Sequence, residues 1–408
     1  MIRTLGISSQ SAIKEESMSS SFYRRAGVNL EVGDEFSSIA GEVCRSSFDN
    51  SPYIRVLVPE QSSFRGPRSF QFVNVPLDWT FDLCPDGAGT KPVFCDALIG
   101  ALRKPELVRW AAADWWQMCV ADVLRWGGLP VLVVNQLDVR SLGDPKGSED
   151  ERLRNAIFCQ MMAGLGQIAR EEEVVLYRGE TAEMGLCVGS DNPDPFAPFL
   201  WSGAALGLYD PSRMIVGENL EPGMVVIALR EFGFGANGLS AARKAFSMMF
   251  GEGWHSNSHA INMIGQAAEP CSSYSSYLKD LNGWGKRGRV PVCLISHLTG
   301  GGIVDKFYRD MLRPRGLSAV LDDLWAPPPI MRSCLDWSEG QMTEEEAYQS
   351  FNGGQRMLLT VRPIDVEDCL RRAGHFNVHA KVCGKITQEA QPTLRIQSGY
   401  SRKILEWD

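Results

Sequence analysis

Helix-like and strand-like patterns alternate along this chain, and that alternation limits it to the α/β class of folds. Apolar residues between Pro105 and Gly127 recur every three or four positions, which predicts a helix with one buried stripe. Residues 129–134 and 174–177 are short apolar runs typical of buried strands, and residues 152–173 between them are predicted to be helical. Strand, helix and strand in this order are the unit from which α/β sheets are built.

The pattern is interrupted by a Gly/Pro-punctuated segment near residues 211–222 and then restarts. We therefore predict two domains, 1–214 and 215–408, each long enough for a core of its own. In the second domain we expect strands at 224–229, 292–295, 357–361 and 378–386 and helices at 239–250 and 365–372. We predict a long insertion or loop at residues 251–290, and poor order in the Ser-rich residues 1–25.

Composition excludes several classes of function. The 41 basic and 49 acidic residues give a formal net charge of −8, which argues against a nucleic-acid partner. Eleven scattered cysteines without a C-x-x-C pair favour reduced thiols and a cytoplasmic location. Because no apolar run reaches the roughly 18 to 20 residues of a membrane-spanning helix, we also expect no membrane association.

A glycine-bearing loop follows the first predicted strand, residues 69–83. Residues 86–91 read Asp-Gly-Ala-Gly-Thr-Lys, so Gly87 and Gly89 could expose backbone N–H groups to phosphate oxygens while Lys91 supplies positive charge. The segment is not a P-loop. The alternative is a tight turn with a surface lysine and a capping aspartate.

Four carboxylates come from separate segments, and three of them stand where an apolar element gives way to a loop: Asp86, Asp122, Glu180 and Glu183. Oxygen ligands of this kind suit Mg²⁺ bound to ATP phosphates. Solvated carboxylates that cap helices are the alternative for any one of them.

Two further turns could hold ligands. Residues 295–302 end a strand with His297, Thr299 and three glycines, so the backbone could approach an anion closely before a helix begins at Ile303. A flexible turn with a hydrogen-bonded histidine is the alternative. Asn237 begins a similar loop-to-helix start, where Asn237 or Ser240 could cap the helix instead of touching a ligand.

Taken in order, these segments resemble the aminoimidazole ribonucleotide synthetase (phosphoribosylformylglycinamidine cyclo-ligase) family, in a longer and divergent bacterial branch. The resemblance rests on six collinear motifs: residues 23–28, 86–91, 179–184, 237–244, 297–302 and 351–354. The chain departs from the family pattern at Ala121, Arg178 and Gly235. These departures motivate an alternative, a nucleotide-binding regulatory or scaffold paralogue with altered catalysis.

The resemblance implies an ATP-dependent enzyme of purine biosynthesis that closes the imidazole ring of formylglycinamidine ribonucleotide. It implies Mg²⁺ at Asp86, Asp122 and Glu180, and His297, Lys91 and Asp122 as catalytic residues. It further implies an anionic group of the substrate at Thr299, Gly300, Gly301 and Gly302, and ATP at Asp86, Gly87, Gly89, Thr90, Lys91, Gly179, Glu180, Thr181 and Asn237. The implied architecture is two α/β domains, with an N-terminal sheet at the core of a homodimer and a C-terminal mixed sheet with helices.

Overall fold

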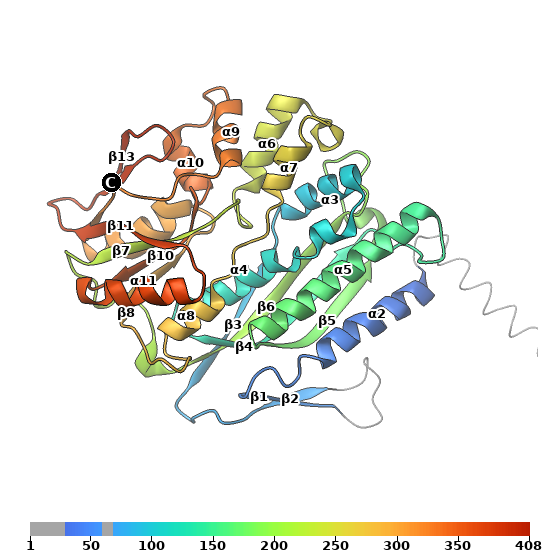
Figure 1. The fold of residues 1–408 in the computed structure, drawn as a ribbon, viewed down its shortest axis with the longest axis horizontal. Coiled ribbons are helices and arrows are strands. Elements are labelled where there is room, and N and C mark those ends of the chain that lie inside the picture. Colours follow the sequence, from blue (N-terminus) through green and yellow to red (C-terminus); the bar gives the residue numbers. More distant parts are fainter. Residues whose placement is uncertain (1–28, 59–67) are drawn as a thin grey trace, which may run out of the picture.

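The computed structural model describes residues 29–58 and 68–408, which form two α/β halves packed side by side (Figure 1). The predicted poor order of residues 1–25 and the motif at 23–28 lie outside the described residues. In the first half the helices and strands are α2 Leu30–Arg45, β1 Ile54–Leu57, β2 Ser69–Phe72, β3 Thr80–Gly87, α3 Lys91–Leu102, α4 Ala112–Leu124, β4 Leu129–Val139, α5 Glu149–Glu171, β5 Val175–Glu183 and β6 Phe199–Tyr209.

The second half contains a larger set of shorter elements. They are β7 Val225–Arg230, α6 Leu239–Phe250, α7 Ile261–Ala267, α8 Ser275–Leu281, β8 Val292–His297, a π-helix Val304–Leu312, β9 Ser318–Leu321, α9 Pro329–Trp337, α10 Glu344–Ser350, β10 Gln355–Val361, α11 Val366–His375, β11 Ala380–Thr387, β12 Leu394–Gln397 and β13 Ile404–Trp407. In the described ranges, no helix combines the length and apolar character needed to cross a bilayer.

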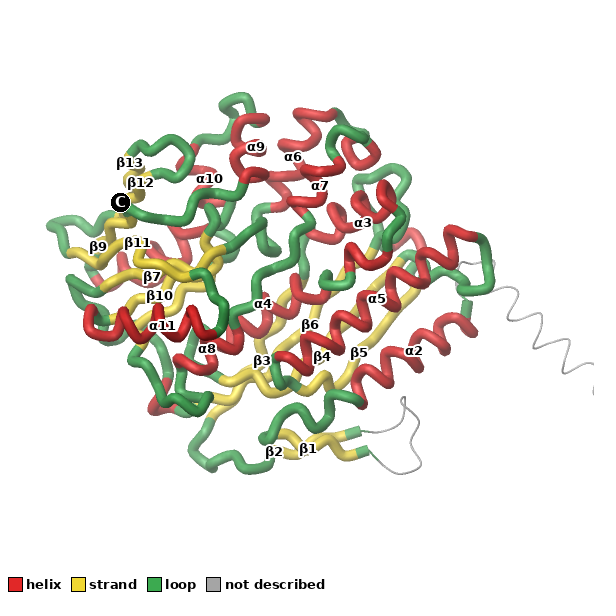
Figure 2. The backbone as a smooth tube through the Cα atoms, in the orientation of Figure 1, coloured by secondary structure: helices red, strands yellow, loops and turns green. Residues whose placement is uncertain are grey.

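The first half is built on a four-stranded sheet of order β3-β6-β4-β5, in which only β4 and β5 are parallel. Figure 2 shows α2, α4 and α5 lying over one face of this sheet. The α5 helix begins with a capping box, in which Ser148 and Glu151 each accept a hydrogen bond from the other's backbone N–H. The β1–β2 hairpin packs on part of the opposite face, where Phe70 joins a small apolar cluster with Leu206 and Leu208.

The second half is built on a seven-stranded mixed sheet of order β13-β12-β9-β11-β7-β10-β8. One apolar core runs through both halves, from Val32 to Val378. At the junction the ring of Phe94 on α3 lies 5.3 Å from that of Phe246 on α6 and 5.1 Å from that of Trp254. Because these rings share one core, the two halves are held in a fixed relation.

The alternation of elements confirms the predicted α/β class, while several boundaries differ from the predictions. Residues 69–83 form two strands, not one, and β3 continues through Gly87 because its backbone pairs with β6 as far as Ser202. Residues 178–183 belong to β5 because their backbone pairs with β4. For residues 251–290 the loop alternative is wrong, since the segment contains α7 and α8, and the insertion alternative stays a prediction. Each of the two helices spans only seven residues, too few for a periodic pattern to stand out.

Candidate functional site

The centre of the candidate site is a carboxylate and histidine pair that joins the two halves. Asp122 lies near the end of α4, and its Oδ1 accepts a hydrogen bond of 3.0 Å from Nδ1 of His297, the last residue of β8. Arg125 Nε lies 3.2 Å from the same oxygen. Burial alone would raise the pKa of Asp122, but His297 and the nearby arginines hold it below its usual value.

His297 is 1% exposed, which decides its charge. Burial, with the positive charge of Arg356, lowers the pKa of His297 to about 4 despite the hydrogen bond to Asp122. The imidazole is therefore neutral near pH 7, with its proton on Nδ1 facing the carboxylate. Its buried Nε2 has no hydrogen-bond partner among the described residues.

Asp86 contributes a second carboxylate to the region of the Asp122–His297 pair. It is the penultimate residue of β3 and accepts a 2.7 Å hydrogen bond from the backbone N–H of Gly87. Partial burial raises the pKa of Asp86, and the negative charge of Asp122 raises it further. The charge of Asp122 is therefore felt at Asp86, which places the two carboxylates in one region of the molecule.

The predicted loop after β3 lies against the loop before α6. Thr90 Oγ1 is 3.0 Å from Ser240 Oγ. Gly89 has a positive φ of 57°, and a Cβ built there would stand 3.1 Å from the carbonyl oxygen of Ala236. Glycine at 89 thus permits both the left-handed backbone and the close approach of the two loops. Asn237, at the tip of the second loop, directs its Nδ2 to the sulfur of Met118 at 3.3 Å.

The turn at 299–302 and the loop before α6 both pack against the segment 348–354. A Cβ at Gly302 would stand 2.1 Å from the carbonyl oxygen of Tyr348, and one at Gly238 would stand 2.5 Å from that of Ser350. Asn352 Nδ2 donates to the carbonyl oxygen of Gly233 at 3.0 Å. Four of the sequence motifs, those containing residues 86–91, 237–244, 297–302 and 351–354, are therefore neighbours in the fold.

Lys91 differs from its predicted role at a phosphate. Its side chain is fully buried, and Nζ lies 3.4 Å from Oδ1 of Asp114. Nζ also donates to the carbonyl oxygens of Gly235, at 2.8 Å, and Glu269. These partners take all three N–H groups of the ammonium, so in this structure Lys91 joins α3 to the second half and has no donor left for a phosphate.

The structure separates Glu180, with Gly179 and Thr181, from the other predicted site residues. Asp86 pairs across the sheet with the row that contains Gly179, three strand spacings or about 14 Å away. Glu180 is the next residue along β5, so its side chain points to the opposite face of the sheet from Asp86. In the described part of the chain, no group of three or more His, Cys, Asp or Glu residues is arranged to hold a metal ion.

Arg356 is a residue of this region that our sequence analysis missed. It is 2% exposed, donates to the carbonyl oxygen of Gln117 at 3.2 Å and lies 3.7 Å from buried Glu231. Its charge acts on Asp86, Asp122 and His297. A charged residue directly before the predicted apolar strand at 357–361 was the available signal, because a buried guanidinium needs partners.

Comparisons with known proteins show which proteins this chain is similar to. Residues 221–397 match the family described as AIR synthase related protein, C-terminal domain. A phosphoribosylformylglycinamidine cyclo-ligase of Lachnoclostridium phytofermentans is 27% identical over 365 residues, covering 89% of this chain and 96% of that protein. One from Carboxydothermus hydrogenoformans is 28% identical over 308 residues, covering 74% and 79%.

Solved structures share the fold at lower identity. The hydrogenase maturation protein HypE in complex with ATP matches with a TM-score of 0.52 at 13% identity, over 82% of this chain and 86% of that one. Thiamine-monophosphate kinase from Stenotrophomonas maltophilia matches with a TM-score of 0.52 at 11% identity, over 87% and 94%. Residues 221–397 are therefore similar to the AIR synthase related C-terminal domain, most of the chain is similar to the cyclo-ligases, and the chain shares the fold of HypE and of thiamine-monophosphate kinase.

Proposed function

We propose that this protein is an ATP-dependent cyclo-ligase that converts formylglycinamidine ribonucleotide to aminoimidazole ribonucleotide. The observation that carries the proposal is the convergence of Asp86, Asp122, His297 and the glycine turns in a chain whose relatives bear that name. In this reaction the formyl amide oxygen attacks the γ-phosphorus of ATP and ADP leaves. The amidine nitrogen then attacks the activated carbon, its C–O bond breaks, and phosphate leaves as the nitrogen loses a proton.

Asp86 and Asp122 fit a Mg²⁺ ion that accompanies ATP. They are mutually interacting carboxylates on neighbouring elements, and Mg²⁺ is commonly held by one or two carboxylates together with substrate phosphates. Bound there, the ion would neutralise charge on the transferring phosphoryl group. The Asp122 carboxylate also holds Nδ1–H of His297, which leaves Nε2 as the nitrogen that could orient the substrate or accept its proton.

We assign the turn at 299–302 to an anionic group of the substrate. Gly301 and Gly302 both have positive φ and are closely packed, whereas a Cβ at Gly300 would meet no atom within 4 Å. The turn therefore combines a fixed backbone with an open side at Gly300. Glycine turns of this kind let backbone N–H groups face an anion.

The reaction can be tested directly. Purified protein with formylglycinamidine ribonucleotide and Mg²⁺–ATP should yield aminoimidazole ribonucleotide and ADP in equal amounts, measured by chromatography. Binding of ATP without ring closure would contradict the proposal and identify a nucleotide-binding paralogue.

Substitution of Asp86 by Asn should weaken Mg²⁺–ATP binding about tenfold, because it removes one of two charged oxygen ligands from the proposed ion site. Calorimetric titration with a non-hydrolysable ATP analogue measures the effect. The matched control is Asp82→Asn, which removes an exposed carboxylate from the same strand and should leave affinity unchanged. Equal affinities for the wild type and Asp86→Asn would show that Asp86 holds no nucleotide-bound ion.

We further propose a homodimer formed through the uncovered part of the four-stranded sheet. Phe81 and Leu83 on β3 are 64% and 61% exposed, and Leu200 on β6 is 49% exposed on the same face. Large apolar side chains gathered on one sheet face mark an interaction surface. Glu180 lies on this face too, so in such a dimer it would meet the partner subunit instead of its own Asp86.

Substitution of Leu83 by Asp should convert the dimer to a monomer, because it places a charge at the centre of the proposed interface. Light scattering coupled to size-exclusion chromatography measures the mass. The control is Ile364→Asp, at an apolar residue that is 81% exposed outside this face. A wild-type protein that is monomeric at micromolar concentration would contradict the proposal.

The cysteines support a cytoplasmic location. All eleven lie within the described residues, and every one is a free thiol. Disulfides are rare in reducing compartments, so eleven free thiols fit the cytoplasm.

A further inference from the structure

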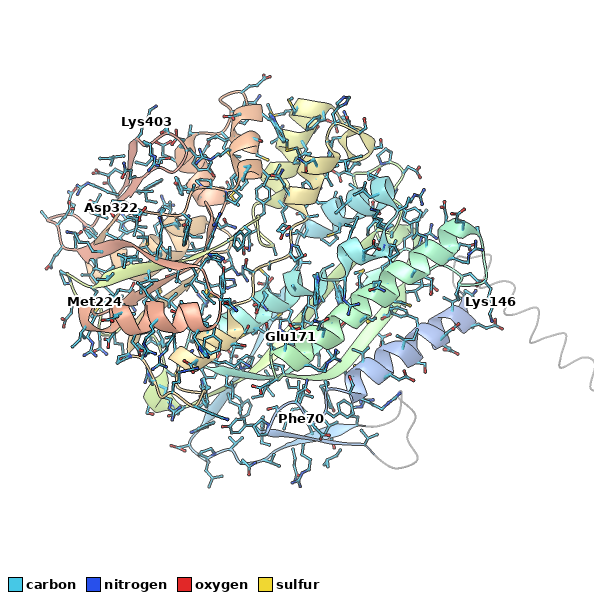
Figure 3. All side chains as sticks on the ribbon, in the orientation of Figure 1. Phe70, Lys146, Glu171, Met224, Asp322 and Lys403 are labelled. Carbon is cyan, nitrogen blue, oxygen red and sulfur yellow. The ribbon has the colours of Figure 1, made fainter. Side chains whose placement is uncertain are left out.

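A second cavity lies between the two halves, apart from the site described above. Its volume is about 500 Å³, which lies in the range of small-molecule sites. Tyr53, Leu129 and Glu173 line it from the first half. Lys279 and Trp284 are among the residues that line it from the second half, whereas Asp86, Asp122 and His297 do not reach it. Figure 3 shows α5 running from near Lys146 at one edge of the molecule to Glu171, close to α8, which carries Lys279.

Lys279 is the polar group that gives this cavity a chemical preference. It is 9% exposed, and its ammonium donates to the carbonyl oxygen of Glu172, its one hydrogen-bond acceptor among the described residues. Two of its three N–H groups therefore have no protein acceptor there. A largely buried ammonium with unused donors is stabilised when an anion occupies the space beside it.

Glu172, whose carbonyl oxygen accepts from Lys279, is itself held in place by hydrogen bonds to its side chain. The Glu172 carboxylate accepts from Trp116 Nε1 at 2.7 Å, from Gln117 Nε2 at 2.5 Å and from Ser273 Oγ at 2.6 Å. These bonds tie the end of α5 to α4 and to the segment before α8. The position of the ammonium is thus set by the scaffold and not by a mobile side chain alone.

The remaining charges around the cavity are positive on balance. Lys286 is exposed and forms no ion pair with any described residue, and Arg287 Nη1 lies 3.3 Å from Asp280. Asp280 is also paired with Arg372 at 3.0 Å, so two arginines neutralise this one carboxylate. The opposing charges are Glu173 and the carboxylate of Glu172. With Arg287 and Arg372 counted against Asp280, four cations face three carboxylates, so the balance is positive by one charge.

Aromatic side chains form part of the wall. The Trp284 indole donates to the carbonyl oxygen of Gly127 at 3.0 Å, and its ring lies edge-on to Trp79 at 5.1 Å. The Tyr53 and Trp79 ring centroids are 5.9 Å apart. Phe376 is covered by the Arg287 guanidinium, 5.6 Å from its ring. These contacts hold flat apolar surfaces beside the cationic groups, as an aromatic ligand requires.

We propose that this cavity is a binding site for a small aromatic phosphate, a planar ring system joined to a phosphate group, with the phosphate at Lys279 and Lys286 and the ring against Trp284. The site is independent of the proposed catalytic function and is formed only when the two halves are packed together.

The test uses 5′-AMP as the probe and calorimetry on the full chain. We expect one AMP per chain to bind at this site, with affinity reduced about tenfold by Lys279→Met and also reduced by Lys286→Glu, since each removes a cation from the phosphate. Lys279→Arg should retain binding, and Lys306→Glu, at a surface lysine in the π-helix, should change nothing. Inorganic phosphate and adenosine should each bind at least tenfold more weakly than AMP.

Three results would overturn the proposal: no AMP binding to the wild type, equal binding of AMP and inorganic phosphate, or full affinity in both Lys279→Met and Lys286→Glu. Because Lys286 is exposed, its variant is informative even if Lys279→Met fails to fold. Loss of AMP binding in Asp122→Asn but not in the lysine variants would place AMP at the proposed catalytic site, and this also overturns the cavity site. Failure of the ring-closing activity leaves these outcomes unchanged.

Discussion

Substitution of Asp122 by Asn is expected to lower kcat/KM for ring closure about 10³-fold. The substitution removes the negative charge that we assign to Mg²⁺–ATP. It also replaces the acceptor that holds the Nδ1 proton of His297, at 3.0 Å, with a group that can donate instead. One change therefore disturbs both charge neutralisation and the tautomer of the histidine. Product formation measured against substrate concentration gives the effect.

The control for this experiment is Asp310→Asn, at a 53% exposed carboxylate paired only with Lys306 across the surface among the described residues. Its activity should equal that of the wild type. Circular dichroism should show an intact fold in both variants. Activity within threefold of wild type in Asp122→Asn would remove Asp122 from the catalytic centre.

Substitution of Lys91 by Met should reduce the free energy of unfolding by about 3–5 kcal/mol, because it leaves the Asp114 carboxylate buried without its cation. Asp114 is 1% exposed, and Lys91 is fully buried. The change also removes hydrogen bonds to the carbonyl oxygens of Gly235 and Glu269. Urea denaturation measures the loss.

The double variant Lys91→Met/Asp114→Leu tests the reason for that loss. Removing both charges should recover much of the stability lost in the single variant, since an apolar pair of similar size avoids the buried charge. Lys306→Met is the surface control and should cost less than about 1 kcal/mol. A stable Lys91→Met protein that no longer binds ATP would instead support the phosphate contact predicted from the sequence.

Local patterns predicted much of the fold because they depend on neighbouring residues. The helix predicted at 239–250 is α6 Leu239–Phe250, and the strand predicted at 224–229 is β7 Val225–Arg230. Gly238, with φ of 76°, stands directly before α6 as the expected loop-to-helix turn requires. The short helices α7 and α8 were missed because their stability comes from burial of residues such as Tyr277 in the shared core, which no local pattern reports.

The candidate site was predicted less completely, since its residues are distant in sequence. Asp122 and His297 were both identified, and the fold joins them across 175 positions. Arg356 was missed because its importance comes from the charges around it. The predicted domain boundary at 214/215 stays a prediction, although the four-stranded sheet ends at Tyr209 and the next strand begins at Val225.

The sequence by itself determined the α/β class, the glycine turns after strands and the set of motifs that carry the resemblance to the cyclo-ligases, because each depends on residue type and short spacing. Only the tertiary structure decided which charged groups share a face and which are buried. Asp86 and Glu180 stand on opposite faces of one sheet, since side chains alternate along strands and the register between strands fixes the result. Lys91 is paired with Asp114 because α3 and α4 bring the two together in a core that excludes water.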